Sequence, residues 1–167
     1  MRSISALTSA VAFMMLLMAV GTLSAQEDIK KEITVPGETG LQWLNTGIIV
    51  AAGDTVQLDA KGEVDVGGSW GIHGPEGTTK FSDQPPGYYP LESKLRYGVI
   101  ARITPAVIKK NQNTQIWVYG EKKEIIATAA GTLWLTVNDD APEGNTGEFT
   151  VTVTVIKKKT KPTGKTT

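Results

Sequence analysis

Apolar and polar side chains alternate along much of the chain. The clearest example is EFTVTVTVI at 148–156, in which Phe149, Val151, Val153 and Val155 share one side and three threonines share the other. A period of two marks a β-strand with one buried and one solvated face. The same alternation predicts strands in TVQLDAKG at 55–62, QIWVY at 115–119 and TLWLTV at 132–137. Further strands are expected at 42–50, 97–103 and 124–130.

Turn-forming residues separate these strands and indicate the fold class. Gly, Pro, Asp and Asn gather at 51–54, 67–68, 85–87, 109–113 and 136–149. No segment repeats apolar residues at helical spacing. The many short strands therefore predict an all-β fold, an antiparallel β-sandwich or jelly roll. The stretch 67–93 breaks the rhythm, and a loop of that length is typically either functional or disordered.

The two ends of the chain are expected to lie outside the folded domain. Arg2 precedes an apolar run at 10–20, and Ala25 ends a sequence suited to signal peptidase, so 1–25 is predicted to be a signal peptide. The run is shorter than the roughly 20 residues of a membrane-spanning helix. We therefore expect export to the periplasm or the cell exterior. Residues 26–40 are assigned to a lead-in segment, 41–156 to the sandwich domain and 157–167 to a basic disordered tail.

Composition excludes several classes of function. The chain has 17 basic and 17 acidic residues, a balance that lacks the basic face of a nucleic-acid-binding protein. It has no cysteine and one histidine, His73, which leaves no His–Cys metal site and no cysteine nucleophile. No serine has a nucleophile-elbow context, and no glycine-rich phosphate loop is present. A facing pair of carboxylates stays open, because any two acids can meet in space. The sequence thus favours a binding module over an enzyme.

The loop TVNDDAPEGNTGEF at 136–149 is the candidate for metal binding. Asp139, Asp140 and Asn145 offer carboxylate and amide oxygens, which suit Ca²⁺ together with main-chain carbonyls. The same residue types are common in any tight connection, because they adopt turn conformations at low cost. Composition alone leaves both interpretations open.

Three motifs along the chain carry a family resemblance. They are LNTGIIVAAGDTVQLDAKGEV at 44–64, GPEGTTKFSDQ at 74–84 and GTLWLTVNDDAPEGNTGEFTVTV at 131–153. Together they resemble the PA-IL family, the calcium-dependent galactose-binding lectins of bacteria, in which Asn-Asp ends a strand and Asn-x-Gly-x-Phe leads into the last one. The resemblance implies a galactose-binding-domain-like β-sandwich.

The resemblance also implies a set of site residues. Asp139 and Asn145 would bind both calcium and sugar, and Val66 would coordinate the ion through its main-chain carbonyl. Asp140 would replace a ligand missing from this loop, which is shorter than in the sugar-binding members. In the long loop, Gln84 would hydrogen-bond the sugar, and Phe81 would stack on it from the position of a sugar-contacting histidine.

The resulting hypothesis is a secreted, non-catalytic, lectin-like module that binds a carbohydrate of the galactose type, with Ca²⁺ as cofactor. The alternative is a sandwich that has lost the sugar site and serves as an envelope or cell-surface interaction protein. Trp117, Tyr119 and Trp134 are expected on exposed faces. There they would form either contacts between subunits of a homo-oligomer or the second face of a covered sheet.

Overall fold

A computed structural model describes residues 27–80, 89–91, 95–105 and 114–159. The predicted signal peptide, Phe81 and Gln84 lie outside these residues, as does the greater part of the predicted basic tail. In the part of the chain that is described, no helix is both long and apolar enough to cross a bilayer.

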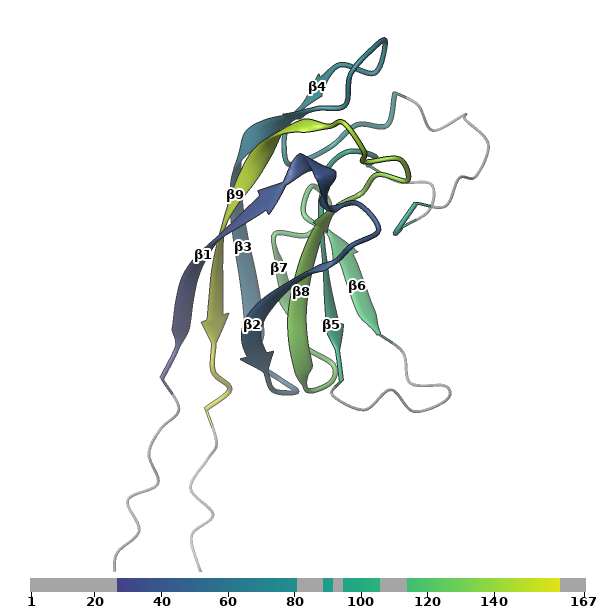
Figure 1. Cartoon of the computed structure of the whole chain (residues 1–167). Coiled ribbons are helices and arrows are strands. Elements are labelled where there is room, and N and C mark those ends of the chain that lie inside the picture. Colours follow the sequence, from purple (N-terminus) through teal and green to yellow (C-terminus); the bar gives the residue numbers. More distant parts are fainter. Residues whose placement is uncertain (1–26, 81–88, 92–94, 106–113, 160–167) are drawn as a thin grey trace, which may run out of the picture.

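Two antiparallel sheets pack face to face, which confirms the predicted all-β sandwich (Figure 1). The five-stranded sheet contains β1 (Ile29–Pro36), β9 (Thr146–Ile156), β3 (Thr55–Asp65), β4 (Ile72–His73) and β7 (Glu124–Ile126). The four-stranded sheet has the order β2 (Leu44–Val50), β8 (Gly131–Val137), β5 (Val99–Thr104) and β6 (Gln115–Val118). A short 3-10 helix, η1 (Gly37–Thr39), follows β1.

Strand β9 is the centre of the five-stranded sheet. It pairs with β1 on one side and with β3 along its whole length on the other. Its apolar residues Phe149, Val151, Val153 and Val155 have no exposed surface, whereas its threonines are only partly buried. The alternation seen in the sequence is therefore the alternation between the core and the solvated face of this sheet.

Strand β1 was assigned to the lead-in segment, yet it forms the edge of the five-stranded sheet. All eight of its residues are in register with β9, from Ile29 opposite Val155 to Pro36 opposite Glu148. Only two residues of the strand, Ile33 and Val35, are buried in the hydrophobic core. An edge strand needs few apolar residues, and this explains why the alternation is weak here. The sandwich thus starts before residue 41.

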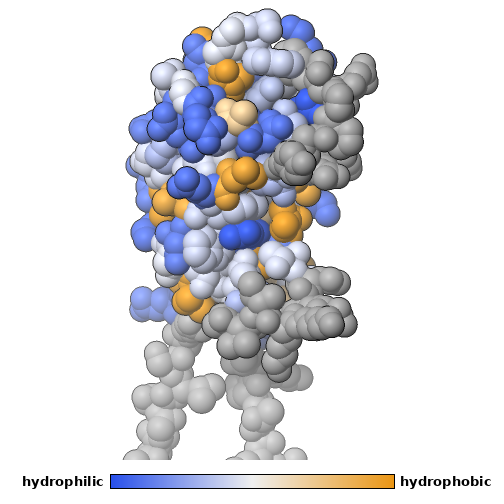
Figure 2. All heavy atoms as spheres, turned by 45° about the vertical axis from the view of Figure 1, so that its right-hand side comes forward, coloured by the Kyte–Doolittle hydropathy of each residue, from blue (hydrophilic) through white to orange (hydrophobic). Residues whose placement is uncertain are grey.

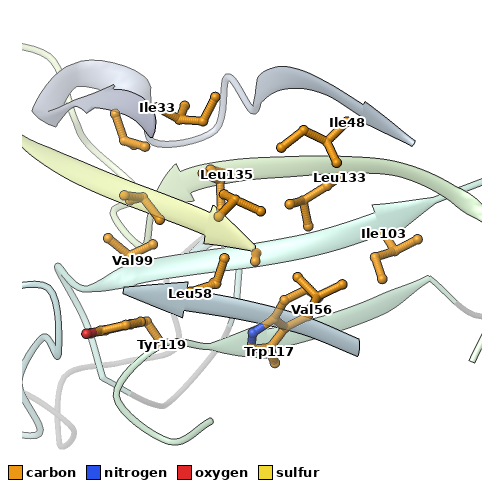
Figure 3. Packing of buried hydrophobic residues seen from close by; sticks show 14 of the residues in the cluster. Ile33, Ile48, Val56, Leu58, Val99, Ile103, Trp117, Tyr119, Leu133 and Leu135 are labelled. Atoms are coloured by element: carbon orange, nitrogen blue, oxygen red, sulfur yellow. The ribbon is translucent and has the colours of Figure 1, made fainter. Parts of the chain in front are cut away.

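The expectation that Trp117 and Tyr119 lie on an exposed face is wrong. Trp117 and Tyr119 are 5% and 2% exposed, while Ile116, which precedes Trp117 in β6, is 37% exposed. Figure 3 shows both rings in the packed interior with Val56 and Leu58 of the other sheet, and all four belong to one hydrophobic cluster. Alternation shows which residues share a face, but it does not show which face turns inward.

The start of the predicted disordered tail is also anchored. Lys157 is 8% exposed, and its Nζ lies 3.0 Å from Asp54 Oδ2. The main-chain N–H of Lys157 donates to Asp28, and that of Lys158 donates to Asp54. The tail prediction is therefore wrong for Lys157 and Lys158, and residues 160–167 lie outside the described part. Figure 1 shows that the chain enters and leaves the sandwich at the same end.

Exposed hydrophobic side chains are dispersed. Ile49, Ile72 and Ile126 are each more than 60% exposed, and they belong to β2, β4 and β7. On the face in Figure 2, orange residues are scattered among hydrophilic ones. Single exposed hydrophobic residues are ordinary on a protein surface. A homo-oligomer stays a prediction.

Candidate functional site

The loops at the end of the sandwich opposite the termini form a pocket of about 340 Å³. It lies between the segment after β3, the segment before β5 and the hairpin that joins β8 to β9. The lining residues are Val66, Trp70, Tyr89, Arg96, Tyr97, Asp139, Asp140 and Ala141. Three of the four residues predicted to hold a metal, namely Val66, Asp139 and Asp140, therefore meet at one cavity.

Hydrogen bonds hold the side chain of Asp139 in place just after the end of β8. It is 3% exposed. Its Oδ1 accepts from the Ala141 N–H at 3.1 Å, and its Oδ2 accepts from the Asn145 side chain at 2.7 Å. These two hydrogen bonds hold the carboxylate in one orientation at the wall of the pocket.

Asn145 is placed differently from its predicted role as a ligand. Its Nδ2 donates both to Asp139 Oδ2 and to the Gly37 carbonyl at 3.1 Å, which orients the amide group. It is 6% exposed and does not line the pocket. A Cβ on Gly37 would lie 2.8 Å from Val64 and 3.3 Å from Asn145, so η1 can approach this closely only with a glycine there. In this structure Asn145 orients the carboxylate of Asp139 from behind.

Asn138 fastens the long loop to the end of β8. Its Oδ1 accepts from the Leu91 N–H and its Nδ2 donates to the Leu91 carbonyl, both at 3.0 Å. Its main chain also bonds to Gly98 and Tyr97. Asn138 has no exposed surface. Sequence reasoning noted Asn138 only as part of a motif, and its contact with a residue 47 positions away was not foreseen.

Arg96 and Tyr97 are site residues that sequence reasoning missed. Arg96 is 3% exposed, and its Cζ lies 4.4 Å from the centroid of the Tyr89 ring. Tyr97 stacks on His73 with 4.8 Å between ring centroids. Its φ of 65° is rare for a residue with a Cβ, and such backbone strain costs on the order of 1–3 kcal/mol. Strain of this kind gathers at ligand sites, and it leaves no mark in the sequence.

The two tyrosines in the pocket stay protonated at neutral pH. Burial raises the pKa of Tyr89, and its hydrogen bond with Tyr97 and the charge of Asp140 act in the same direction. Burial also raises the pKa of Tyr97, against the opposing effects of the Tyr89 hydrogen bond and of Arg96. The phenol groups are therefore neutral and act as donors or acceptors of hydrogen bonds.

The residues at the pocket suit a hard cation. Asp139 and Asp140 bring carboxylates to it, and Val66 lines the same pocket. Calcium takes six to eight oxygens, which can include carbonyls and oxygens of a ligand. No group of three His, Cys, Asp or Glu residues gathers within the described ranges, so protein carboxylates alone would not complete the shell. Arg96 brings a positive charge to the same pocket and would weaken cation binding.

The remaining predicted sugar contacts, Phe81 and Gln84, lie outside the described residues. Trp70 and Tyr89, from the same long loop, do line the pocket. Trp70 is 37% exposed and therefore available to a ligand.

Comparisons with known proteins bear on the fold. No protein-family model and no curated protein matches the chain. Among solved structures, the chain is similar to one described as "EclA N-terminal domain; PllA-like lectin", with a TM-score of 0.50 and 21% sequence identity. The match covers 74% of this chain and 94% of that one. At this identity the likeness shows that the chain has the β-sandwich fold found in a lectin domain.

Proposed function

We propose that the pocket at Asp139 binds a carbohydrate and that the protein is an exported, non-catalytic binding module. The observation that carries the proposal is the meeting of an oriented, buried carboxylate with Trp70 and Tyr89 in one cavity. Sugars present hydroxyl groups on their edges and C–H groups on their faces. Carboxylates accept hydrogen bonds from the hydroxyl groups, and aromatic rings pack against the C–H groups.

Calcium is proposed as the cofactor of this site, held by Asp139, Asp140 and the main-chain carbonyl of Val66. When bound, the ion would offer coordination positions to hydroxyl oxygens, which otherwise gain little by exchanging water for protein. The hydrogen bonds from Ala141 and Asn145 keep the Asp139 carboxylate in one orientation. With two carboxylates and the opposing charge of Arg96, the dissociation constant is expected in the weak extracellular class, about 10⁻⁴–10⁻³ M.

The test is calcium titration by calorimetry on chelator-treated protein comprising residues 26–167, followed by glycan-array screening with and without calcium. The Asp139→Asn variant keeps the shape of the side chain and removes its charge, and we expect it to lose the calcium heat and the part of the glycan binding that depends on calcium. Asp59→Asn makes the same charge change on the exposed part of β3 and is the matched control. Glycan binding that survives chelation but is lost in Asp139→Asn would remove calcium from the proposal and leave the sugar site. Absence of both signals in the unmodified protein would favour the alternative, an interaction protein without a sugar site.

A further inference from the structure

A second, larger cavity lies on the other side of the β8–β9 hairpin. Its volume is about 720 Å³, and it runs between the segment 36–45 and the hairpin loop. Asp139, Asp140 and Ala141 line the first pocket, whereas the next three residues, Pro142, Glu143 and Gly144, line the second. One loop therefore separates two cavities, and we call the second one the tryptophan groove after Trp43 and Trp134 in its lining.

The walls of the tryptophan groove are tied to each other. Gly40 packs so closely on Pro142 that a Cβ at this position would overlap the proline ring. The hydroxyl of Thr136 donates to the Gly40 carbonyl at 2.5 Å, and that of Thr39 accepts from the Val137 N–H at 3.3 Å. These contacts fix the segment 36–45 against β8 and the hairpin. The groove is consequently present without a ligand, which lowers the entropy lost on binding.

Arg102 positions the two tryptophan rings. Asn45, Trp134 and Arg102 lie side by side on neighbouring strands of the four-stranded sheet. The Arg102 Cζ is 4.2 Å from the centroid of the Trp43 ring and 5.4 Å from that of Trp134. Cation–π contacts of this kind hold an aromatic ring in one orientation. Two oriented indole rings are a rigid surface for a flat or ring-shaped ligand.

The polar side chains indicate the chemistry of the ligand. Glu38, Gln42, Asn45 and Glu143 also line the tryptophan groove, so carboxylates and amides stand beside the indole rings. A ligand with apolar faces and many hydroxyl groups matches the indole rings and the side-chain acceptors together.

A basic peptide is the less favoured occupant. The guanidinium of Arg102 already lies over both rings, and its positive charge opposes a second cation on them. A neutral ligand meets no such opposition. We propose that the tryptophan groove is a second carbohydrate-binding site, which takes a neutral oligosaccharide and is independent of the pocket at Asp139.

The experiment uses the four tryptophans of the chain as separate reporters. Trp70 lines the first pocket, Trp43 and Trp134 line the tryptophan groove, and Trp117 is buried in the core. Protein labelled with 5-fluorotryptophan gives one ¹⁹F NMR signal for each residue, assigned through four Trp→Phe variants. Neutral glucan, mannan, galactan and chitin oligosaccharides are added in turn, and a peptide of the sequence KKKTKPTGKTT serves as the cationic probe.

We expect at least one neutral oligosaccharide to shift the Trp43 and Trp134 signals in a saturable way, with Trp117 unchanged. The shift should persist in Asp139→Asn and should weaken at least tenfold in Glu143→Gln, whose exposed side chain is not needed for folding. No shift of Trp43 and Trp134 with any oligosaccharide at millimolar concentration would overturn the proposal, and so would a shift caused by the peptide alone. A response of Trp70 reports the first pocket, so failure at one site is distinguished from failure at the other.

Discussion

Asp54→Ala would remove the carboxylate that pairs with a buried lysine where the chain leaves the sandwich. The side chains of Asp54 and Lys157 are 3% and 6% exposed, and their charged atoms lie 3.0 Å apart. Asp54 also accepts from the N–H groups of Ala51 and Lys158 at 2.9 Å and 3.0 Å. After the substitution, the Lys157 ammonium would keep only the Ile49 carbonyl at 3.3 Å as its partner within the described structure.

The expected loss of stability follows from this burial. Removing one partner of a buried ion pair leaves an uncompensated charge and typically costs about 3–5 kcal/mol. Both side chains are almost fully buried, so the range for buried pairs applies. With an unfolding entropy of about 2.1 cal/mol/K for each of about 130 residues, the melting temperature should fall by roughly 11–18 °C.

Urea unfolding followed by tryptophan fluorescence measures the change, with thermal unfolding as a second assay. The control is Asp28→Ala, which removes one hydrogen bond that the Lys157 N–H donates to an exposed carboxylate and should cost only about 1 kcal/mol. The double variant Asp54→Ala/Lys157→Met removes both charges and should regain much of the lost stability. A loss below about 1 kcal/mol in Asp54→Ala, or a double variant no more stable than the single one, would refute the reasoning.

Two further predictions concern the same end of the chain and the candidate site. Burial acts to raise the pKa of Asp54, but hydrogen bonds from Lys158 and Ala51 and the Lys157 ammonium outweigh it, so the folded pKa lies below its ordinary value. The stability from this group is therefore present above about pH 3.9 and is lost as the pH falls through the folded pKa. Unfolding measured at several pH values should show this dependence for the unmodified protein and not for Asp54→Ala. Asn138→Ala should leave the Leu91 main chain without its partners and cost about 1–3 kcal/mol. Faster hydrogen exchange of the Leu91 amide, with the amides of β9 unchanged, would locate that loss in the long loop.

The strands could be predicted where alternation is strong and the strand is central. Four apolar residues alternate with threonines in β9, and this pattern arises only if one face of the strand is buried. The same reasoning was insufficient at two places. Strand β1 has little apolar surface because it lies at an edge, and QIWVY offers two apolar faces, so its inward side depended on the space between the sheets.

The candidate site was predicted only in part. Asp139, Asp140 and Val66 could be named because residue types that bind a cation cluster in short motifs. Arg96 and Tyr97 could not be named, because their position at the pocket depends on how the long loop is fastened to β8 by Asn138.

The sequence by itself determined that this chain forms a β-sandwich and that the β8–β9 hairpin carries oxygen ligands, because strand periodicity and loop chemistry are local properties. Only the tertiary structure decided that Asn145 orients Asp139 from outside the pocket and that the hairpin has a cavity on each side. It also decided that Lys157 is buried against Asp54. Each of these facts joins residues from separate strands or loops, and their distance in space follows from the packing of the two sheets and not from neighbours in the chain.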